Sequence, residues 1–184
     1  MNLKDFEASL AACPVYDYRF IEPGSINFSE KARHICLTDC SRYEKCWMCP
    51  PNISPVSECA EKLKKYSGCM VFSTASEVSD IYDTEECLKV KNEHESITYE
   101  AKTLAENYFE DIYVLSSGCT LCGECTYPDS ECRFPRKAFP AVESHGIILM
   151  QLAEELGMEY ELSNDYIIYF SMIFFDRPKK SAQA

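Results

Sequence analysis

Residues 166–175 read YIIYFSMIFF and form the longest apolar run in the chain. Apolar side chains occupy both alternating faces of this segment, a pattern typical of a strand that is covered on both sides. The run has ten residues, about half of the length that a membrane-spanning helix needs. We therefore expect a buried β-strand at this position.

Shorter segments of both strand-like and helix-like periodicity precede this strand. Alternation or short apolar runs predict strands at residues 15–21, 69–72 and 112–115. Helical spacing and capping residues predict helices at residues 1–13, from 28 to the first cysteines, and at 55–67, 84–109 and 142–156. Because helices separate the strands, we expect an α/β fold whose central sheet of about four strands is mostly parallel and flanked by helices.

Length and charge narrow the class of protein further. A chain of 184 residues is typical of one domain, so residues 1–184 are expected to form a single α/β domain. The formal charge of −12 argues against nucleic acid or an anionic membrane as a partner, since both favour a basic surface. The first residues lack the pattern of a secretion signal, so we expect a soluble cytoplasmic protein.

Cysteine is the residue type that departs most from an ordinary composition. The chain has twelve cysteines, of which four lie at residues 36–49, four at residues 119–132, and four alone. Without a secretion signal, this many cysteines indicate metal or redox chemistry rather than disulfides. We therefore expect two cysteine-rich metal-binding loops, in the reducing cytoplasm of an anaerobe.

The second cysteine group has the sharper pattern, GCTLCGECTYPDSEC at residues 118–132. Its candidate ligands are Cys119, Cys122, Cys125 and Cys132. Three cysteines at successive three-residue steps let one tight loop reach three corners of a 4Fe–4S cluster, as in bacterial ferredoxins, and the fourth cysteine comes from farther along the chain. Structural zinc usually takes two separated Cys-x2-Cys pairs, so zinc is the alternative. The basic residues Arg133, Arg136 and Lys137 either compensate an anionic cluster, form a docking rim, or are solvated surface.

The first cysteine group can also supply four thiolates, but its pattern is less determinate. Its candidate ligands are Cys36, Cys40, Cys46 and Cys49. Cys36 and Cys40 are four residues apart, so they share a helix face if the helix extends that far. Trp47 and Tyr43 could shield a cluster from water or could be core aromatics.

Several of these residues together resemble one family. The motifs are Cys36-x3-Cys40-x2-Tyr43-x-Lys45-x-Trp47-x-Cys49-Pro50-Pro51, Cys119-x2-Cys122-x2-Cys125, Cys132-Arg133-x-Pro135 and Glu143-x2-Gly146-Ile147. They resemble the domain of unknown function 2284 (DUF2284) family of predicted metal-binding proteins, from about residue 36 to the end of the chain. The resemblance implies metal or iron–sulfur binding in anaerobic bacteria and archaea and implies no established reaction.

Two positions depart from the pattern of that family. The family often has glycine where this chain has Glu44, and a residue other than cysteine where it has Cys46. The departure at Cys46 leaves two ligand sets open for the first site, one with all four cysteines and one with Cys36, Cys40 and Cys49 alone. A cluster with three thiolates leaves one iron open to a substrate or another exogenous ligand.

The remaining cysteines and the histidines are interpreted mainly as core residues. Cys59, Cys87 and Cys69 fall on apolar stripes or in a buried strand, and free cysteine is often buried. Cys13, followed by a proline, is either a core residue or a remote ligand. His94 lies on the core stripe of the longest predicted helix, whereas His34 and His145 could replace a thiolate or relay protons.

These patterns lead to three hypotheses for function. The first is a protein that carries one or two 4Fe–4S clusters and moves single electrons to or from a partner enzyme in anaerobic metabolism. The second is an iron–sulfur enzyme with an open-site cluster that binds a small substrate. The third is a structural zinc module that organises partner contacts. No phosphate-binding glycine loop or nucleophile elbow is present in the sequence.

Overall fold

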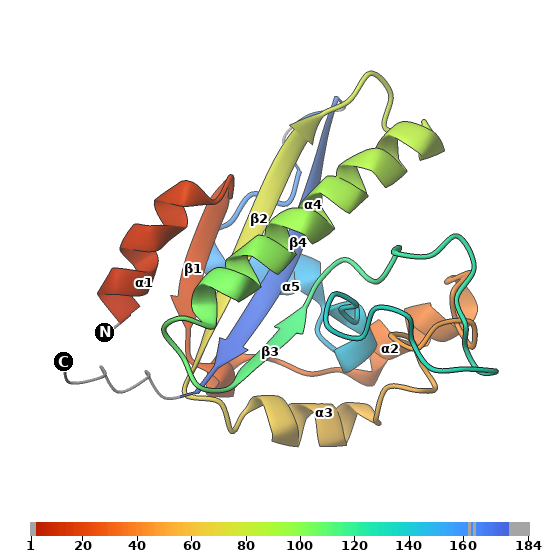
Figure 1. Cartoon of the computed structure of the whole chain (residues 1–184), viewed down its shortest axis with the longest axis horizontal. Coiled ribbons are helices and arrows are strands. Elements are labelled where there is room, and N and C mark those ends of the chain that lie inside the picture. The colour runs from red at the N-terminus through yellow and green to blue at the C-terminus, as the bar shows by residue number, and fades with distance from the viewer. Residues whose placement is uncertain (1–2, 162, 164, 177–184) are drawn as a thin grey trace.

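The computed structural model describes residues 3–161, 163 and 165–176. Its centre is a four-stranded sheet in the order β1-β2-β4-β3 (Figure 1). The strands are β1 (Asp17–Ile21), β2 (Gly68–Glu77), β3 (Ile112–Leu115) and β4 (Tyr166–Phe175). The run that the sequence singled out is therefore one of the two inner strands, hydrogen-bonded to β2 on one side and to β3 on the other.

All three strand pairs are antiparallel, so the prediction of a mostly parallel sheet is wrong. The reason lies in the last strand. β2 and β3 do run in the same direction, as a strand-helix-strand unit requires, because each is antiparallel to β4. They are not neighbours, however, because β4 enters between them from the far end of the chain and pairs with both.

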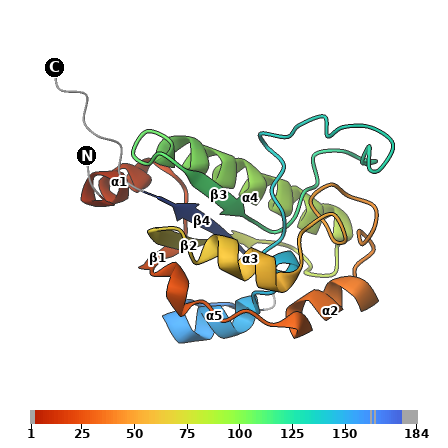
Figure 2. The same ribbon diagram turned by 90° about the horizontal axis from the view of Figure 1, so that it is seen from below.

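Helices cover both faces of this sheet. One face carries α1 (Leu3–Ser9) and α4 (Thr84–Ala105), and the other carries α3 (Val56–Leu63) and α5 (Leu149–Leu156), as Figure 2 shows. Alternate residues of β4 supply the two cores: Met172 and Phe174 pack toward α3 and α5, and Ile173 and Phe175 pack toward α1 and α4. The prediction that this strand is buried on both faces is confirmed.

The other elements differ from their predicted bounds mainly at their ends. α2 (Glu30–Thr38) is capped by Ser29, whose hydroxyl accepts from the backbone N–H of Lys31. The segment predicted as one helix at 142–156 is divided into a 3₁₀ turn, η3 (Glu143–His145), and α5, because Gly146 takes a left-handed conformation between them. Two further 3₁₀ turns are η1 (Leu10–Ala12) and η2 (Pro23–Ser25).

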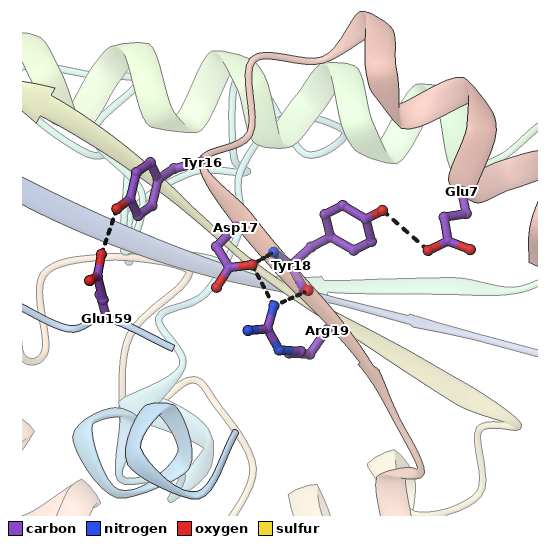
Figure 3. Close-up of polar contacts among 6 residues, drawn as sticks. All are labelled: Glu7, Tyr16, Asp17, Tyr18, Arg19 and Glu159. Carbon is purple, nitrogen blue, oxygen red and sulfur yellow. Dashed lines mark hydrogen bonds and ion pairs between the residues drawn. The ribbon is translucent and has the colours of Figure 1, made fainter. Parts of the chain in front are cut away.

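The edge strand β1 is held by polar contacts on both sides, as the close-up in Figure 3 shows. The hydroxyl of Tyr16, just before the strand, donates to Glu159 at 2.5 Å, and that of Tyr18 donates to Glu7 of α1 at 3.2 Å. Arg19 pairs with Asp17 along the strand. Among the described residues, no helix is both long enough and apolar enough to cross a membrane.

Candidate metal centre

The second cysteine group lies in a long excursion between β3 and η3 that is closed at its base. Ser116 donates its backbone N–H to Pro140 at 2.9 Å, and Val142 donates back to Ser116 at 3.1 Å. Gly118 follows with a φ of 94°, a left-handed conformation that glycine adopts at little cost. The backbone therefore turns sharply immediately before Cys119, at the carboxyl end of β3.

Side chains of α4 fix the start of this excursion. One carboxylate oxygen of Glu95, Oε1, accepts from the Ser116 hydroxyl at 2.7 Å and from the backbone N–H and hydroxyl of Ser117 at 3.1 and 2.6 Å. Thr120 donates to Asn92, three residues earlier on the helix, at 2.6 Å. Burial raises the pKa of Glu95, and the hydrogen bonds from the two serines oppose that rise. The long helix thus positions the cysteine loop.

The first cysteine group lies mostly in the connection between α2 and α3. α2 ends at Thr38, so Cys40 lies beyond the helix and does not share a helix face with Cys36. Glu44 has a φ of 59° and donates its backbone N–H to Pro50 at 3.0 Å. A left-handed φ costs about 1–2 kcal/mol for a residue with a Cβ, which is a physical reason for the glycine that the family often has at this position.

The two cysteine loops lie against each other, as both ribbon views show (Figures 1 and 2). Trp47 of the first loop donates its indole N–H to the backbone carbonyl of Ser130 in the second loop at 3.0 Å. Its ring also meets Tyr127 edge-on, with centroids 4.9 Å apart. Trp47 therefore joins the loops, a role that the sequence analysis did not assign to it.

This contact brings thiols from both groups into one pocket. Five predicted ligands line it: Cys46, Cys119, Cys122, Cys125 and Cys132. Cys49 lies alongside, hydrogen-bonded to Cys46 and packed with the same cluster of side chains. Two sequence groups that were expected to form separate loops thus form one continuous thiol-rich region.

The electrostatics of this region centre on Cys46, whose side chain is buried. Hydrogen bonds from the thiols of Cys119 and Cys49, together with one from the Arg42 guanidinium, hold the pKa of Cys46 far below that of an ordinary thiol. The pKa values of Cys49 and Cys119 are raised, because both thiols donate to Cys46 and are themselves buried. The arrangement therefore favours a thiolate at Cys46.

The other two predicted ligands, Cys36 and Cys40, lie outside the pocket. Cys36 is half-buried on α2, and Cys40 is exposed. They interact electrostatically with each other, and Cys40 interacts in turn with Cys49. Burial raises the pKa of Cys36, and the neighbouring carboxylate of Glu143 adds to the rise. These two cysteines extend the thiol-rich region toward the surface.

The donor set fits a thiolate-bound metal centre, and one atom in the pocket wall adds to this fit. The Nε of Arg42 is buried and has no hydrogen-bond partner among the described residues, although Arg42 lines the pocket. A donor of this kind is satisfied when an acceptor such as a sulfur atom occupies the pocket. Within the described residues, no group of three or more His, Cys, Asp or Glu side chains has the spacing to hold a metal ion.

The prediction that Cys59, Cys69 and His94 are core residues is confirmed, and the same prediction for Cys87 is confirmed only in part. Cys59 and Cys69 are buried in the core, whereas Cys87 is half-buried and donates its thiol to the carbonyl of Ile81 at 3.3 Å. His94 is buried and bonded through both ring nitrogens, to Thr74 and Ser171.

His145 and His34 were the two histidines considered for the metal site. Both ring nitrogens of His145 are already engaged, with Tyr113 at 2.9 Å and Ser144 at 3.0 Å. Its ring is buried in the core beside α2. His34 is exposed on α2, outside the thiol pocket. Cys13 packs against the core cluster that includes Phe6 of α1, and it does not line the thiol pocket.

Comparison with protein families identifies the family of this chain. A family model described as "Predicted metal-binding protein (DUF2284)" matches residues 19–175. Searches of curated proteins and of solved structures give no match. The matched segment includes both cysteine loops and all four strands except the first two residues of β1. The chain belongs to the DUF2284 family of predicted metal-binding proteins.

Proposed function

We propose that this protein binds a 4Fe–4S cluster and moves single electrons to or from a partner enzyme. The observation that carries the proposal is the pocket lined by Cys119, Cys122, Cys125 and Cys132, with Cys46 at its wall. The first three cysteines follow at three-residue steps in one loop, the habit of ferredoxin-type ligation. When bound, such a cluster supplies one-electron chemistry.

The surroundings of the pocket favour an iron–sulfur cluster over zinc. Structural zinc usually takes two separated Cys-x2-Cys pairs, whereas three of the pocket cysteines, Cys119, Cys122 and Cys125, follow one another at three-residue steps in a single loop. The Arg42 guanidinium adds a hydrogen-bond donor and a positive charge. Hydrogen bonds to cluster sulfurs and nearby charge are the means by which proteins set cluster potential.

The pocket is also close enough to the surface for electron exchange. Cys122, Cys125 and Cys132 are half-buried, and exposed Leu121 and Phe134 lie at its edge. We place the protein in the cytoplasm of an anaerobe, where exposed thiols and clusters survive. The partner is a redox protein, and neither nucleic acid nor a membrane is needed.

A second cluster is the natural extension of this proposal. Cys36, Cys40 and Cys49 form a connected series beside the pocket. Three thiolates would leave one iron of that cluster open, which is the alternative function, an iron–sulfur enzyme acting on a small substrate. A structural zinc module is the remaining alternative.

Anaerobic purification followed by iron and sulfide counting and electron paramagnetic resonance tests the proposal. We expect a brown protein with acid-labile sulfide, and a resonance that appears on reduction with dithionite. Cys122→Ser should lower the iron and sulfide content, whereas the matched change Cys87→Ser, on a half-buried cysteine that does not line the pocket, should leave both unchanged. A colourless protein with stoichiometric zinc would refute it.

The same preparation separates the two alternatives. An open iron predicts that the spectrum changes when cyanide, a small iron ligand, is added, and that Cys36→Ser removes this change. A zinc module predicts that dithionite changes nothing and that chelators unfold the protein. Neither result is expected from a single fully ligated cluster.

A further inference from the structure

Two cations from different parts of the chain converge on the thiol pocket. Lys91 comes from α4, and a Cβ added to Gly118 would lie 3.8 Å from its Nζ, so the ammonium group rests against the turn that precedes Cys119. Lys91 interacts electrostatically with the thiols of Cys49 and Cys119. Its side chain is half-buried, and it lies on the helix one turn before Glu95, which accepts the hydrogen bonds of Ser116 and Ser117.

Arg42 approaches the same thiols from the first cysteine loop. Its guanidinium hydrogen-bonds to Cys46 and interacts electrostatically with Cys49 and Cys119. It lines the pocket, and its buried Nε keeps one donor without a partner among the described residues. Each cation therefore interacts with both Cys49 and Cys119.

Two cations that lie this close to each other are stabilised only if negative charge lies nearby. Arg42 and Lys91 repel each other, and burial adds a desolvation cost to each. The carboxylates of Glu95 and Glu143 interact with Lys91 and offset part of this cost. The favourable partners of Arg42 are the thiols of Cys46, Cys49 and Cys119. The arrangement suits a site that carries several negative charges.

We propose that the positive charges of Arg42 and Lys91 raise the reduction potential of the metal centre. The inference rests on the proposed function. A thiolate-bound cluster that took up one electron from a partner protein would become more negative by one charge. Two partly desolvated cations would stabilise this reduced form more than the oxidised one, and the buried Nε of Arg42 would be free to donate to a cluster sulfur.

The test measures the midpoint potential of the purified holoprotein by dye-mediated titration followed by electron paramagnetic resonance. Lys91→Met and Arg42→Met should each lower the midpoint potential. A shift of about 59 mV corresponds to a tenfold change in the one-electron equilibrium. The matched controls are Lys89→Met, on the exposed side of the same helix, and Arg136→Met, an exposed arginine of the second loop. Their effect should be small and should vanish at high salt, which screens exposed charges.

The outcomes separate this inference from the proposed function. Iron-free wild-type protein would refute the proposed function itself. A normal cluster whose potential is the same in Lys91→Met and Arg42→Met as in the two controls would overturn the inference alone. If Lys91→Met loses iron, Lys91→Arg tests whether the positive charge is responsible. Retention of iron in Lys91→Arg supports a role for the charge, and loss of iron in both variants contradicts that role.

Discussion

The sheet and the cysteine loops are built in opposite ways. The sheet is held by long antiparallel ladders and by apolar side chains on both faces. The loops, at residues 39–55 and 116–142, contain no described helix or strand and are fixed by scattered backbone and side-chain hydrogen bonds and by contact with each other. Stability thus resides mainly in one region and the candidate chemistry in the other.

Two buried cysteines, one in the sheet and one in the cysteine loops, differ in the same way. Cys69 is fully buried in β2, where it fills space in the core and burial alone raises its pKa. Cys46 is also buried, yet it lies among two thiols and a guanidinium that lower its pKa. Burial therefore does not distinguish a structural cysteine from a candidate ligand in this protein. The polar groups that surround the sulfur atom do.

The largest expected effect is on the sheet. Phe174→Ala removes a fully buried ring that packs against Tyr66 at 6.0 Å between centroids. The cavity that remains should lower the free energy of unfolding by about 3–5 kcal/mol. Urea denaturation of the metal-free protein measures this loss. Metal bound per folded molecule should not change, and a parallel loss of metal would show that the two regions are coupled.

The next effect is a dependence of stability on pH. Burial lowers the pKa of His145 from 6.5 to about 4, so the folded protein keeps this ring neutral where the unfolded chain binds a proton. The free energy of unfolding should therefore fall as pH decreases from about 6.5 to about 4, by at most about 3 kcal/mol from this group.

Comparison with His145→Gln isolates that contribution, because His94, whose pKa is lowered in the same way, is present in both proteins. Urea denaturation of the metal-free proteins at several pH values gives the two curves. The wild-type curve should be the steeper one between these pH values. Equal slopes would mean that His145 does not stay neutral in the folded protein.

A smaller effect on stability is expected from the cysteine loops. Cys122→Ser changes a half-buried side chain outside the two sheet cores, so the metal-free protein should change in stability by about 0.5 kcal/mol or less. Hydrogen exchange should show unchanged protection of the β2 and β4 amides. Global loss of protection would contradict the separation of the two regions and would favour a structural metal.

The smallest effect is expected at the exposed edge of the sheet. Tyr16→Phe removes the hydrogen bond to Glu159, which lies in solvent (Figure 3). Water replaces such a partner at little cost, so the urea midpoint should not move measurably. A clear decrease would show that β1 depends on this contact for its place in the sheet.

The sequence predicted individual elements better than their arrangement. The bounds of β3 and β4 agree with the predicted segments, because short apolar runs between polar residues mark buried strands clearly. The start of α4 was also predicted, and Asp83 caps it through the backbone N–H groups of Glu85 and Glu86. Strand order was not predicted, because the pairing of β4 with β2 joins segments that are far apart in the chain.

The candidate site shows a similar limit. The spacing of Cys119, Cys122 and Cys125 indicated a metal-binding loop without any structure, and the family match supports metal binding. The contact of Cys46 with Cys119 and the approach of Arg42 could not be predicted, since no local pattern links residues 42–46 with 119. Lys91 and Glu95 are polar residues beside the apolar stripe of α4. This polar pair was a signal in the sequence that the helix contacts a polar site.

By itself, the sequence determined which segments are buried, where the thiols are concentrated and which family the chain resembles. Each of these depends on neighbouring residues or on composition, which can be read along the chain. The tertiary structure decided that the sheet is antiparallel and that two cysteine groups form one region. Both follow from packing between distant segments: β4 fills the space between β2 and β3, and Trp47 brings the two loops together.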